Sequence, residues 1–385
     1  LLLRVAIVGV GWYGFKPSVP ELSFMEMMYE AAVRAYEDAG VNPRSDVDAF
    51  ISCQEDFWEG VAISDEFAPE PIGGVLRPTM TITGDGLQCV GQAYMMIKTG
   101  VFNVIAVEAH AKPSDIVTLQ EIYEFSLDPN LRLLKVGNPL FQAGLDAVAF
   151  MNRSGASREH LAMVAVKNRR RGLLNPRASH ASSIDLKHVL EAPPVIYPMS
   201  RYEIAGFTDV AINVVLASED VARRLTDKPV WLEGIAWATE VGTGAVEWHE
   251  WGRMPSMRLA ALSAYKQAGI EDPLKQTDFA EVEDRFSFME LLSLEELGLG
   301  GGSAHKLLES GFYNPNGSYP VNASGGSLSI GVTLEATGLT RLLEAVLQLR
   351  GEAGGVQLKD VRRAIVASWR GPPTYTSMVA VLSRE

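Results

Sequence analysis

Cysteine, excess positive charge and long apolar runs are all scarce in this chain of 385 residues. Its two cysteines cannot build the disulfide framework of a small secreted protein, so a reducing, cytoplasmic environment is expected. No apolar run approaches the ~20 residues of a membrane-spanning helix. The strand-like opening LLLRVAIVGVG is unlike a signal peptide. There is no CxxC pair, and the scattered histidines give no metal-ligand spacing.

The charge balance is acidic, with 34 lysines and arginines against 47 aspartates and glutamates, for a formal net charge of −13. A nucleic-acid-binding domain needs a net basic face, so that class is excluded. The one basic cluster, residues 167–171, is interpreted as a solvated helix face, with phosphate contact as the alternative. An apolar content of 47% excludes intrinsic disorder.

Strand-like and helix-like segments alternate along the chain. The first part has strand patterns at 4–11, 47–53, 78–82 and 101–108, and helical patterns at 21–40 and 84–100. The later part has strand patterns at 230–236, 279–284, 361–368 and 377–382, and helical patterns at 256–268, 289–297 and 334–349. This alternation predicts an α/β fold in which helices cover both faces of a parallel or mixed sheet.

A weak internal repeat indicates a duplicated body. The pattern AxxAYxxAG ends a predicted helix at 32–40 and again at 261–269. We therefore expect two halves, 1–229 and 230–385. Residues from 110 to about 200 fit neither half, because they are rich in proline and asparagine and lack a steady period. They are interpreted as an inserted region over one face, and long insertions often carry function.

A GxGxxG match at 9–14 directly follows the first strand. A dinucleotide site needs a helix to begin at this motif. Pro17 and Pro20 follow instead, and proline inside a helix costs about 3 kcal/mol. We therefore do not expect a nucleotide site here.

The C-terminal third carries the most specific motifs: YPVNASGGSLS at 319–329, ATGL at 336–339 and QLRGEAG at 348–354. With EVEDRFS at 281–287 and the helical segment 83–100, they resemble the thiolase superfamily, especially its sterol-carrier-protein-type and archaeal branch. The resemblance extends over nearly the whole chain. It implies the thiolase fold, in which duplicated βαβαβ halves form an α/β/α/β/α layered body, here with an inserted loop region.

The resemblance also shows where this chain departs from thiolase chemistry. Thiolases use a cysteine at the N-terminus of a buried helix, where the helix dipole lowers its pKa. That position falls at Thr83, and the activating histidine falls at Val332. The histidine of the H-D-x-F stretch falls at Glu283, and a second cysteine falls near Ser368. Thr83 alone is a poor nucleophile.

Three other groups are candidates for the lost chemistry. A partly desolvated Glu283 would have a raised pKa and could act as a general base, with Asp284 on the opposite face of its strand. Asp85 lies near the helix N-terminus, and His110 follows a strand close to the implied site. The alternative is that these groups fill a decayed site, with Glu283 and Asp85 paired to arginines or backbone amides and His110 as a satisfied polar residue. Cys53 and Cys89 are interpreted as buried structural thiols.

Glycines would supply backbone amide donors and leave room for the coenzyme A thioester. Amides at Gly84 and around Gly371 could hold the thioester enolate. The resemblance also places Gly325 and Gly326 at the site of a coenzyme A thioester, which would be substrate rather than a covalent cofactor. Trp248 and Trp251 are interpreted as a partly exposed loop that could contact a partner, and Trp231 as core.

Three functions remain open at this point. The first is an acyl-CoA enzyme that makes or breaks a C–C bond without an acyl-enzyme, as in retro-aldol cleavage of a β-hydroxyacyl-CoA. The second is an inactive scaffold partnered by a DUF35 protein, an OB-fold with a zinc ribbon, as the resemblance implies. The third is an ordinary acetyl-CoA acetyltransferase. The resemblance also implies a homodimer. An open pocket exposing Glu283 would favour the first function, and a filled pocket the second.

Overall fold

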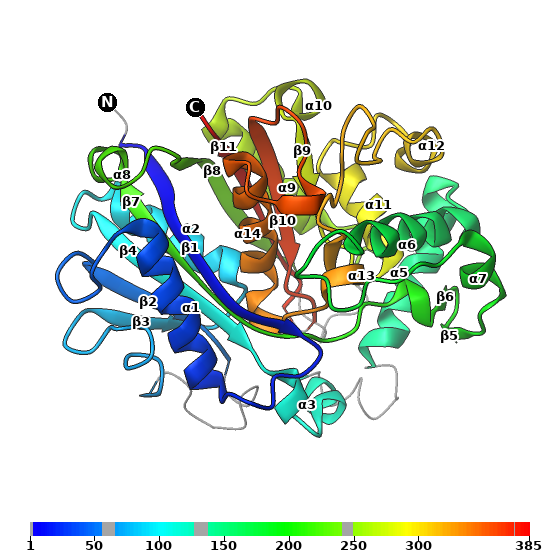
Figure 1. Ribbon diagram of the computed structural model, residues 1–385. Helices are drawn as coiled ribbons and strands as arrows, with labels where there is room; N and C mark the ends of the chain where they lie inside the picture. Colours follow the sequence, from blue (N-terminus) through cyan, green and yellow to red (C-terminus); the bar gives the residue numbers. More distant parts are fainter. Residues whose placement is uncertain (1–2, 56–65, 127–137, 241–248, 373) are drawn as a thin grey trace.

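The computed structural model describes residues 3–55, 66–126, 138–240, 249–372 and 374–385. Nine of the strands in these residues form one mixed sheet in the order β3-β2-β4-β7-β1-β8-β11-β10-β9 (Figure 1). The predicted α/β fold with a mixed sheet is confirmed. None of the helices in these ranges has the length and apolarity that a membrane span requires.

The first half of the sheet holds β1 (Val5–Lys16), β2 (Ala49–Cys53), β3 (Thr79–Ile82), β4 (Val104–Ala111) and β7 (Asp209–Ser218). Its two long helices are α1 (Phe24–Ala39) and α2 (Gly86–Lys98). Strand β2 pairs in parallel with β3 and β4, whereas β7 is antiparallel to β4 and β1. The sequence patterns did not identify β7, whose ten residues are all buried.

The second half holds β8 (Val230–Thr239), β9 (Phe279–Glu281), β10 (Arg363–Trp369) and β11 (Thr376–Ser383). Its long helices are α9 (Pro255–Ala268), α11 (Ser287–Glu296) and α14 (Thr337–Arg350). The predicted strand 279–284 is too long. The backbone amide of Val282 bonds to the side chain of Asn322, at 2.8 Å, and the strand ends at Glu281.

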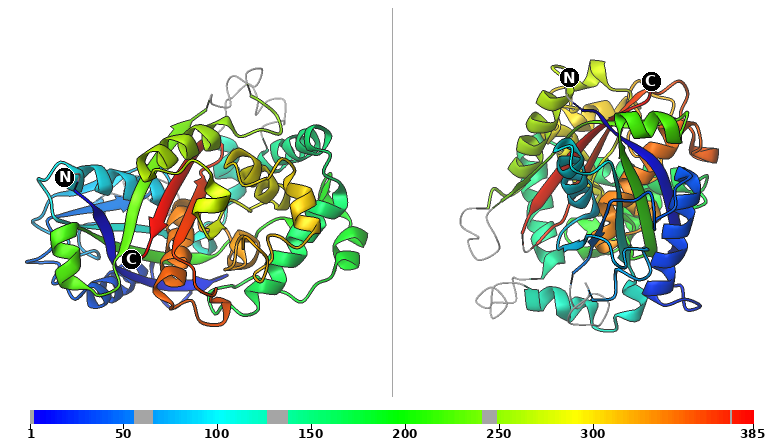
Figure 2. Two further views of the ribbon diagram at one scale, coloured as in Figure 1. Left: turned by 90° about the horizontal axis from the view of Figure 1, so that it is seen from above. Right: turned by 90° about the vertical axis from the view of Figure 1, so that its left-hand side faces the viewer.

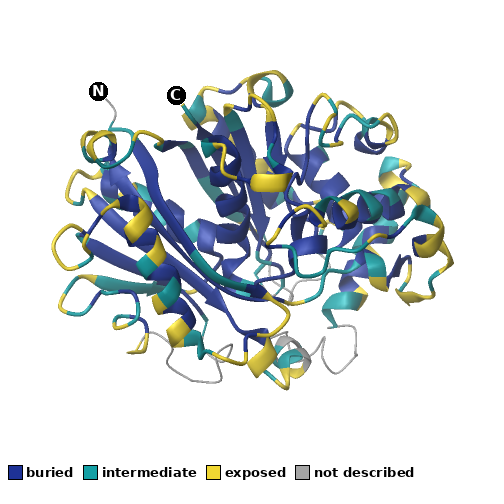
Figure 3. Ribbon diagram, in the orientation of Figure 1, coloured by how far each residue is buried: buried dark blue, intermediate teal, exposed yellow. Residues whose placement is uncertain are grey.

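Helices α2 and α14 pack against each other between the two halves of the sheet, as Figures 1 and 2 show. Helix α1 covers β1 and β7 on one outer face, and α9 covers β8 and β11 on the other. The result is the expected α/β/α/β/α order of layers. The sheet and the central helices are the most continuously buried parts of the molecule (Figure 3).

Glycine allows close packing in the same way in both halves. A side chain at Gly11 on β1 would collide with the carbonyl of Ala31 on α1, and one at Gly234 on β8 with that of Ala264 on α9. Both helices then end at a glycine in the left-handed conformation. This agrees with a duplication, while the boundary at 229/230 stays a prediction. The GxGxxG segment lies inside β1, so no helix begins at it.

The inserted region is mainly helical rather than irregular. It contains α3 (Leu119–Ser126), α5 (Pro139–Ser154), α6 (Arg158–Gly172), α7 (Leu186–Glu191) and the short strands β5 (Pro194–Ile196) and β6 (Met199–Ser200). Helix α6 packs on α11 and on α13 (Gly326–Ile330). Further short helices in the described residues include α8 (Glu219–Leu225), α10 (Pro273–Gln276) and α12 (Ala304–Glu309).

The solvated face predicted for residues 167–171 is wrong. Lys167 pairs with the buried Glu290 at 3.0 Å. The guanidinium of Arg169, a residue only 7% exposed, donates to three backbone carbonyls, those of Tyr202, His180 and Ile204. Helix α6 is therefore buried on several sides, which explains why its sequence shows no clear amphipathic period.

Candidate active site

Asp85 begins the central helix α2. It is the N-cap residue, and its Oδ1 accepts the amide proton of Leu87 at 2.9 Å. Its Oδ2 accepts from the amide of Gly338 at 3.0 Å and from the Ser368 hydroxyl at 2.8 Å. Burial raises the pKa of Asp85 to about 6, although these donors and Arg341 oppose the rise. Asp85 thus joins α2, α14 and β10, and its catalytic role stays a prediction.

Thr83 lies two residues before this cap, and its side chain is exposed. Among the described residues, none provides a base in hydrogen-bond contact with its hydroxyl. A threonine without a base is a weak nucleophile. The position that the resemblance assigns to the catalytic cysteine therefore carries no activated group here.

Glu283 is held by two arginines. Its carboxylate lies 3.2 Å from Nε of Arg285 and 3.1 Å from an Nη atom of Arg341, and the residue is fully buried. Burial alone would raise the pKa of Glu283, but the two guanidinium charges outweigh it and lower the pKa to about 2. The expected raised pKa is wrong, and pairing with arginine, the alternative, is what the geometry gives. A carboxylate this acidic is a weak base.

Asp284 faces the same side as Glu283. Both carboxylates contact Arg341, Asp284 at 3.7 Å, so the expectation that they lie on opposite faces is also wrong. The reason is that β9 ends before them. Asp284 also accepts from the amides of Ser327 and Leu328 at the start of α13. The result is a buried charge network in which arginines balance the carboxylate at the former histidine position.

Glu281, at the end of β9, gives this network a testable pH dependence. Burial raises the pKa of Glu281 from 4.5 to about 8, helped by the charge of Glu344 and opposed by hydrogen bonds from Ser324. Because the pKa of Glu281 is higher in the folded state than in the unfolded state, the protonated side chain contributes fully to the free energy of unfolding at pH values below the unfolded-state pKa. This contribution to stability is lost as the pH rises through the folded-state pKa. We expect Glu281→Gln, which cannot ionise, to remove this loss.

Urea unfolding of the wild type and Glu281→Gln at about pH 6.5 and 8.5 tests this expectation. The variant should gain stability relative to the wild type at the higher pH, by an amount on the order of a few kcal/mol. Glu70→Gln, at an exposed position, is the control and should follow the wild type. The same change in stability between the two pH values for all three proteins would contradict the assignment.

His110 lies within β4, not after it as expected. Its Nδ1 is 2.9 Å from Oε1 of Glu108, and its ring stacks on Phe24 at 5.4 Å between centroids. The residue is 1% exposed. These contacts agree with the alternative of a satisfied polar histidine, and a catalytic role stays untested.

Both cysteines are free and buried, as predicted. The Sγ of Cys89 lies 3.9 Å from the carbonyl of Ile82. Burial raises the pKa of the Cys53 thiol well above its ordinary value, and the neighbouring Cys89 adds to the rise. Cys53 therefore lacks the lowered pKa of a catalytic nucleophile, and the Cys89 thiol is buried as well.

The four glycines expected at the coenzyme A site differ in what they can offer. The amide of Gly325 donates to the Asn322 carbonyl at 2.9 Å, and the amide of Gly326 donates to the Ser324 hydroxyl at 3.0 Å. These two amides are therefore already used within the protein. Gly326 also has a positive φ of 60° and is so close to Asp284 that no side chain would fit. Gly84 and Gly371 are buried, and their role as donors stays a prediction.

A cavity of about 240 Å³ lies beside this network. Its lining includes Val332, at the second former histidine position, and Arg285, the partner of Glu283. Glu283 itself does not line it. Most of the remaining wall is apolar, from α5, α11 and the segments around them: Leu140, Ala143, Ile204, Phe207, Met254, Phe286, Phe288, Met289 and Leu292.

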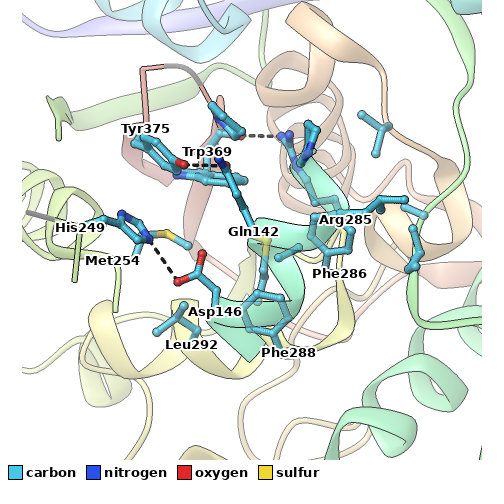
Figure 4. Close-up of a pocket in the computed structure, with 18 of the residues that line it drawn as sticks. Gln142, Asp146, His249, Met254, Arg285, Phe286, Phe288, Leu292, Trp369 and Tyr375 are labelled. Atoms are coloured by element: carbon cyan, nitrogen blue, oxygen red, sulfur yellow. Dashed lines mark hydrogen bonds and ion pairs between the residues drawn. The ribbon is translucent and has the colours of Figure 1, made fainter. Parts of the chain in front are cut away.

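Polar side chains gather in one part of this wall. The Tyr375 hydroxyl donates to Oε1 of Gln142 at 2.8 Å, and Nε2 of His249 lies 3.2 Å from Oδ1 of Asp146. Burial lowers the pKa of His249, but its bond to Asp146 and the charges of Asp146, Glu240 and Glu250 outweigh this and raise it overall. Figure 4 shows the Asp146–His249 pair on one side of the cavity and Arg285 on the other.

The sequence did not identify these polar residues. The sequence points only to Trp248 and Trp251, close to His249, as a partly exposed loop. Trp251 is indeed partly exposed, and Trp248 lies outside the described residues. Asp146 and His249 are brought together by packing between α5 and the segment before α9, which no local pattern encodes. Trp231 is 1% exposed, as expected of a core residue.

Comparison with known proteins decides the family. The profile of the family described as thiolase C-terminal domain-like matches residues 243–384. An acetyl-CoA acetyltransferase of Methanothermobacter thermautotrophicus is 30% identical over 92% of this chain and 93% of its own length. The chain belongs to the thiolase superfamily. It falls in the branch of sterol-carrier-protein-type thiolases and acetyl-CoA acetyltransferases, and its cysteine content agrees with a lost catalytic cysteine.

One further relative and one solved structure are named as a lyase and an aldolase. A 17-hydroxy-3-oxo-4-pregnene-20-carboxyl-CoA lyase of Mycobacterium tuberculosis is 26% identical to this thiolase-like chain over 96% of it and 97% of the lyase. The solved structure described as Ltp2-ChsH2(DUF35) aldolase superposes with a TM-score of 0.85 at 25% identity. That match covers 99% of this chain and 98% of the other.

Proposed function

We propose that this thiolase-like protein binds an acyl-CoA and cleaves the C–C bond next to the thioester by a non-covalent retro-aldol reaction. One observation carries the proposal. An apolar cavity persists beside Val332 and Arg285, although Thr83 and Val332 replace the cysteine and histidine of covalent catalysis. The names of the lyase and aldolase relatives support the same reaction class.

The chemistry needs two things from the protein. When the proton of the β-hydroxyl leaves, the C–O bond becomes a carbonyl and the electrons of the Cα–Cβ bond form a thioester enolate. Arg285 lines the cavity and supplies a cation to hold the enolate oxygen. A base must also take the hydroxyl proton. Glu283, with a pKa of about 2, suits this role poorly. Asp85, with a pKa of about 6, suits it better but does not line the cavity, so its role as the base stays a prediction.

Product analysis tests this function. The purified protein, alone and with any co-purifying small partner, is incubated with a β-hydroxyacyl-CoA. We expect a free ketone or aldehyde and a shortened acyl-CoA. The double variant Cys53→Ser, Cys89→Ser should cleave as fast as the wild type, because neither thiol takes part. Loss of cleavage in a folded double variant would instead indicate cysteine chemistry.

A scaffold function is the second candidate, and one observation favours it. The carboxylate of Glu283 is enclosed by two arginines rather than exposed in the cavity. In this proposal the chain forms a homodimer and holds a DUF35 protein of the OB-fold and zinc-ribbon type, as the name of the aldolase complex suggests. Light scattering of the purified protein and of its complex would measure both associations.

A further inference from the structure

The polar groups of the cavity form a cluster away from Arg285. Three successive contacts run along the cavity wall from Arg285 to His249. The Arg285 guanidinium lies 5.1 Å from the Trp369 ring, Trp369 lies 5.9 Å from Tyr375, and Tyr375 lies 5.0 Å from His249. An acyl group with its thioester at Arg285 would therefore reach toward His249 with its far end.

Gln142 is fixed as a donor at this far end. Its Oε1 accepts the Tyr375 hydroxyl proton at 2.8 Å, which leaves the Nε2 protons on the other side of the amide. No hydrogen-bond partner of Nε2 is found among the residues that the structure describes. Gln142 and Tyr375 are each 6% exposed, so bulk water is scarce around them.

His249 is the second group, and Asp146 positions it. Asp146 is itself anchored, because its Oδ1 accepts the amide proton of Gly252 at 2.9 Å as well as facing Nε2 of His249. The described part of the chain gives Nδ1 of His249 no hydrogen-bond partner. A purely apolar acyl group would displace water from Gln142 and His249 and offer no hydrogen bond in return. A buried polar group left without a hydrogen bond costs free energy.

We propose that Gln142 and His249 bind an oxygen atom carried at the far end of the acyl group. The substrate class is then an acyl-CoA with a ring-sized apolar body and a remote hydroxyl or keto oxygen. The volume agrees with this class: a cavity of about 150 Å³ is enough for benzene, and this one holds about 240 Å³. The inference rests on the proposed function for the placement of the thioester.

Binding of a matched pair of thioesters tests the inference. Phenylpropanoyl-CoA and its para-hydroxy derivative differ only in the remote oxygen, and neither has the β-hydroxyl that cleavage requires. Calorimetric titration of the full chain gives both dissociation constants. We expect the hydroxylated thioester to bind about 10-fold more tightly or better. Equal affinities would overturn the inference and leave the proposed function standing, whereas no binding of either thioester would overturn both.

Three variants separate recognition from packing. Gln142→Met and His249→Gln should each reduce the preference for the hydroxylated thioester. Gln142→Met should bind phenylpropanoyl-CoA at least as tightly as the wild type, because it lacks the amide whose hydrogen bonds this thioester leaves unmade. Leu292→Ala, in the apolar wall, is the control and should weaken both thioesters equally. Melting curves establish that each variant is folded. A preference that survives in the folded Gln142 and His249 variants would contradict the assignment.

Discussion

Replacing Arg341 with methionine is expected to lower the free energy of unfolding by about 3–5 kcal/mol, because it leaves buried carboxylates without their cation. Arg341 is 3% exposed and contacts both Glu283 and Asp284. Its guanidinium also donates to the hydroxyls of Ser327 and Ser368 at 2.8 and 3.3 Å. A single substitution therefore breaks the connection between α14, β10 and the segment after β9.

Chemical denaturation at neutral pH measures this loss. Lys187→Met is the control, since Lys187 pairs with Glu191 on the surface and such exposed pairs contribute about 0–1 kcal/mol. The Arg341 variant should also recover part of its stability as the pH falls, when the remaining carboxyls take up protons. A loss no larger than that of the control would mean that the buried network does not stabilise the fold as described.

Replacing Arg285 with methionine is expected to reduce the cleavage rate about 10²–10³-fold, the usual effect of losing a donor to a developing oxyanion. Arg285 lies at the junction of network and cavity, where it pairs with Glu283 and also lines the space assigned to the acyl-CoA. The loss should appear mainly in kcat, because the enolate charge develops only in the transition state.

The variant Arg285→Lys separates charge from folding. It keeps the cation beside Glu283 and should retain a melting temperature near that of the wild type, with partial activity. Its single ammonium cannot reproduce the fork of a guanidinium, so recovery should be incomplete. If the folded Arg285→Met protein cleaves at the rate of the wild type, Arg285 has no role in the chemistry.

The fold could be predicted because its signals are local and repeated. The alternation of apolar segments gave most strands, and the two AxxAYxxAG helix ends gave the duplication. The contrast between apolar and polar positions is lost in segments that are buried on nearly all sides. Helix α6 buries charged side chains on several sides, and β7 is buried throughout, so neither shows the expected contrast.

The site was harder to predict from the sequence, because its properties come from contacts between segments that are far apart along the chain. The motif at 281–287 singled out Glu283 but could not show that Arg341, from a distant helix, would lower its pKa. The assumption that the strand continued to residue 284 hid the second carboxylate on the same side. Asp146 and His249 are 103 residues apart in the sequence. Only the packing of α5 against the segment before α9 brings Oδ1 of Asp146 within 3.2 Å of Nε2 of His249.

Intact-protein mass spectrometry after incubation with acetyl-CoA, beside a melting curve with the same ligand, tests the central claim most directly. The claim is that an acyl-CoA site persists without covalent catalysis. Ligand at ~100 times its dissociation constant stabilises a protein by ~2.7 kcal/mol, so the melting temperature should rise by a degree or more. The protein mass should stay unchanged. An acetyl adduct on a cysteine would contradict the account, and the absence of any melting shift, even with the partner present, would favour the scaffold.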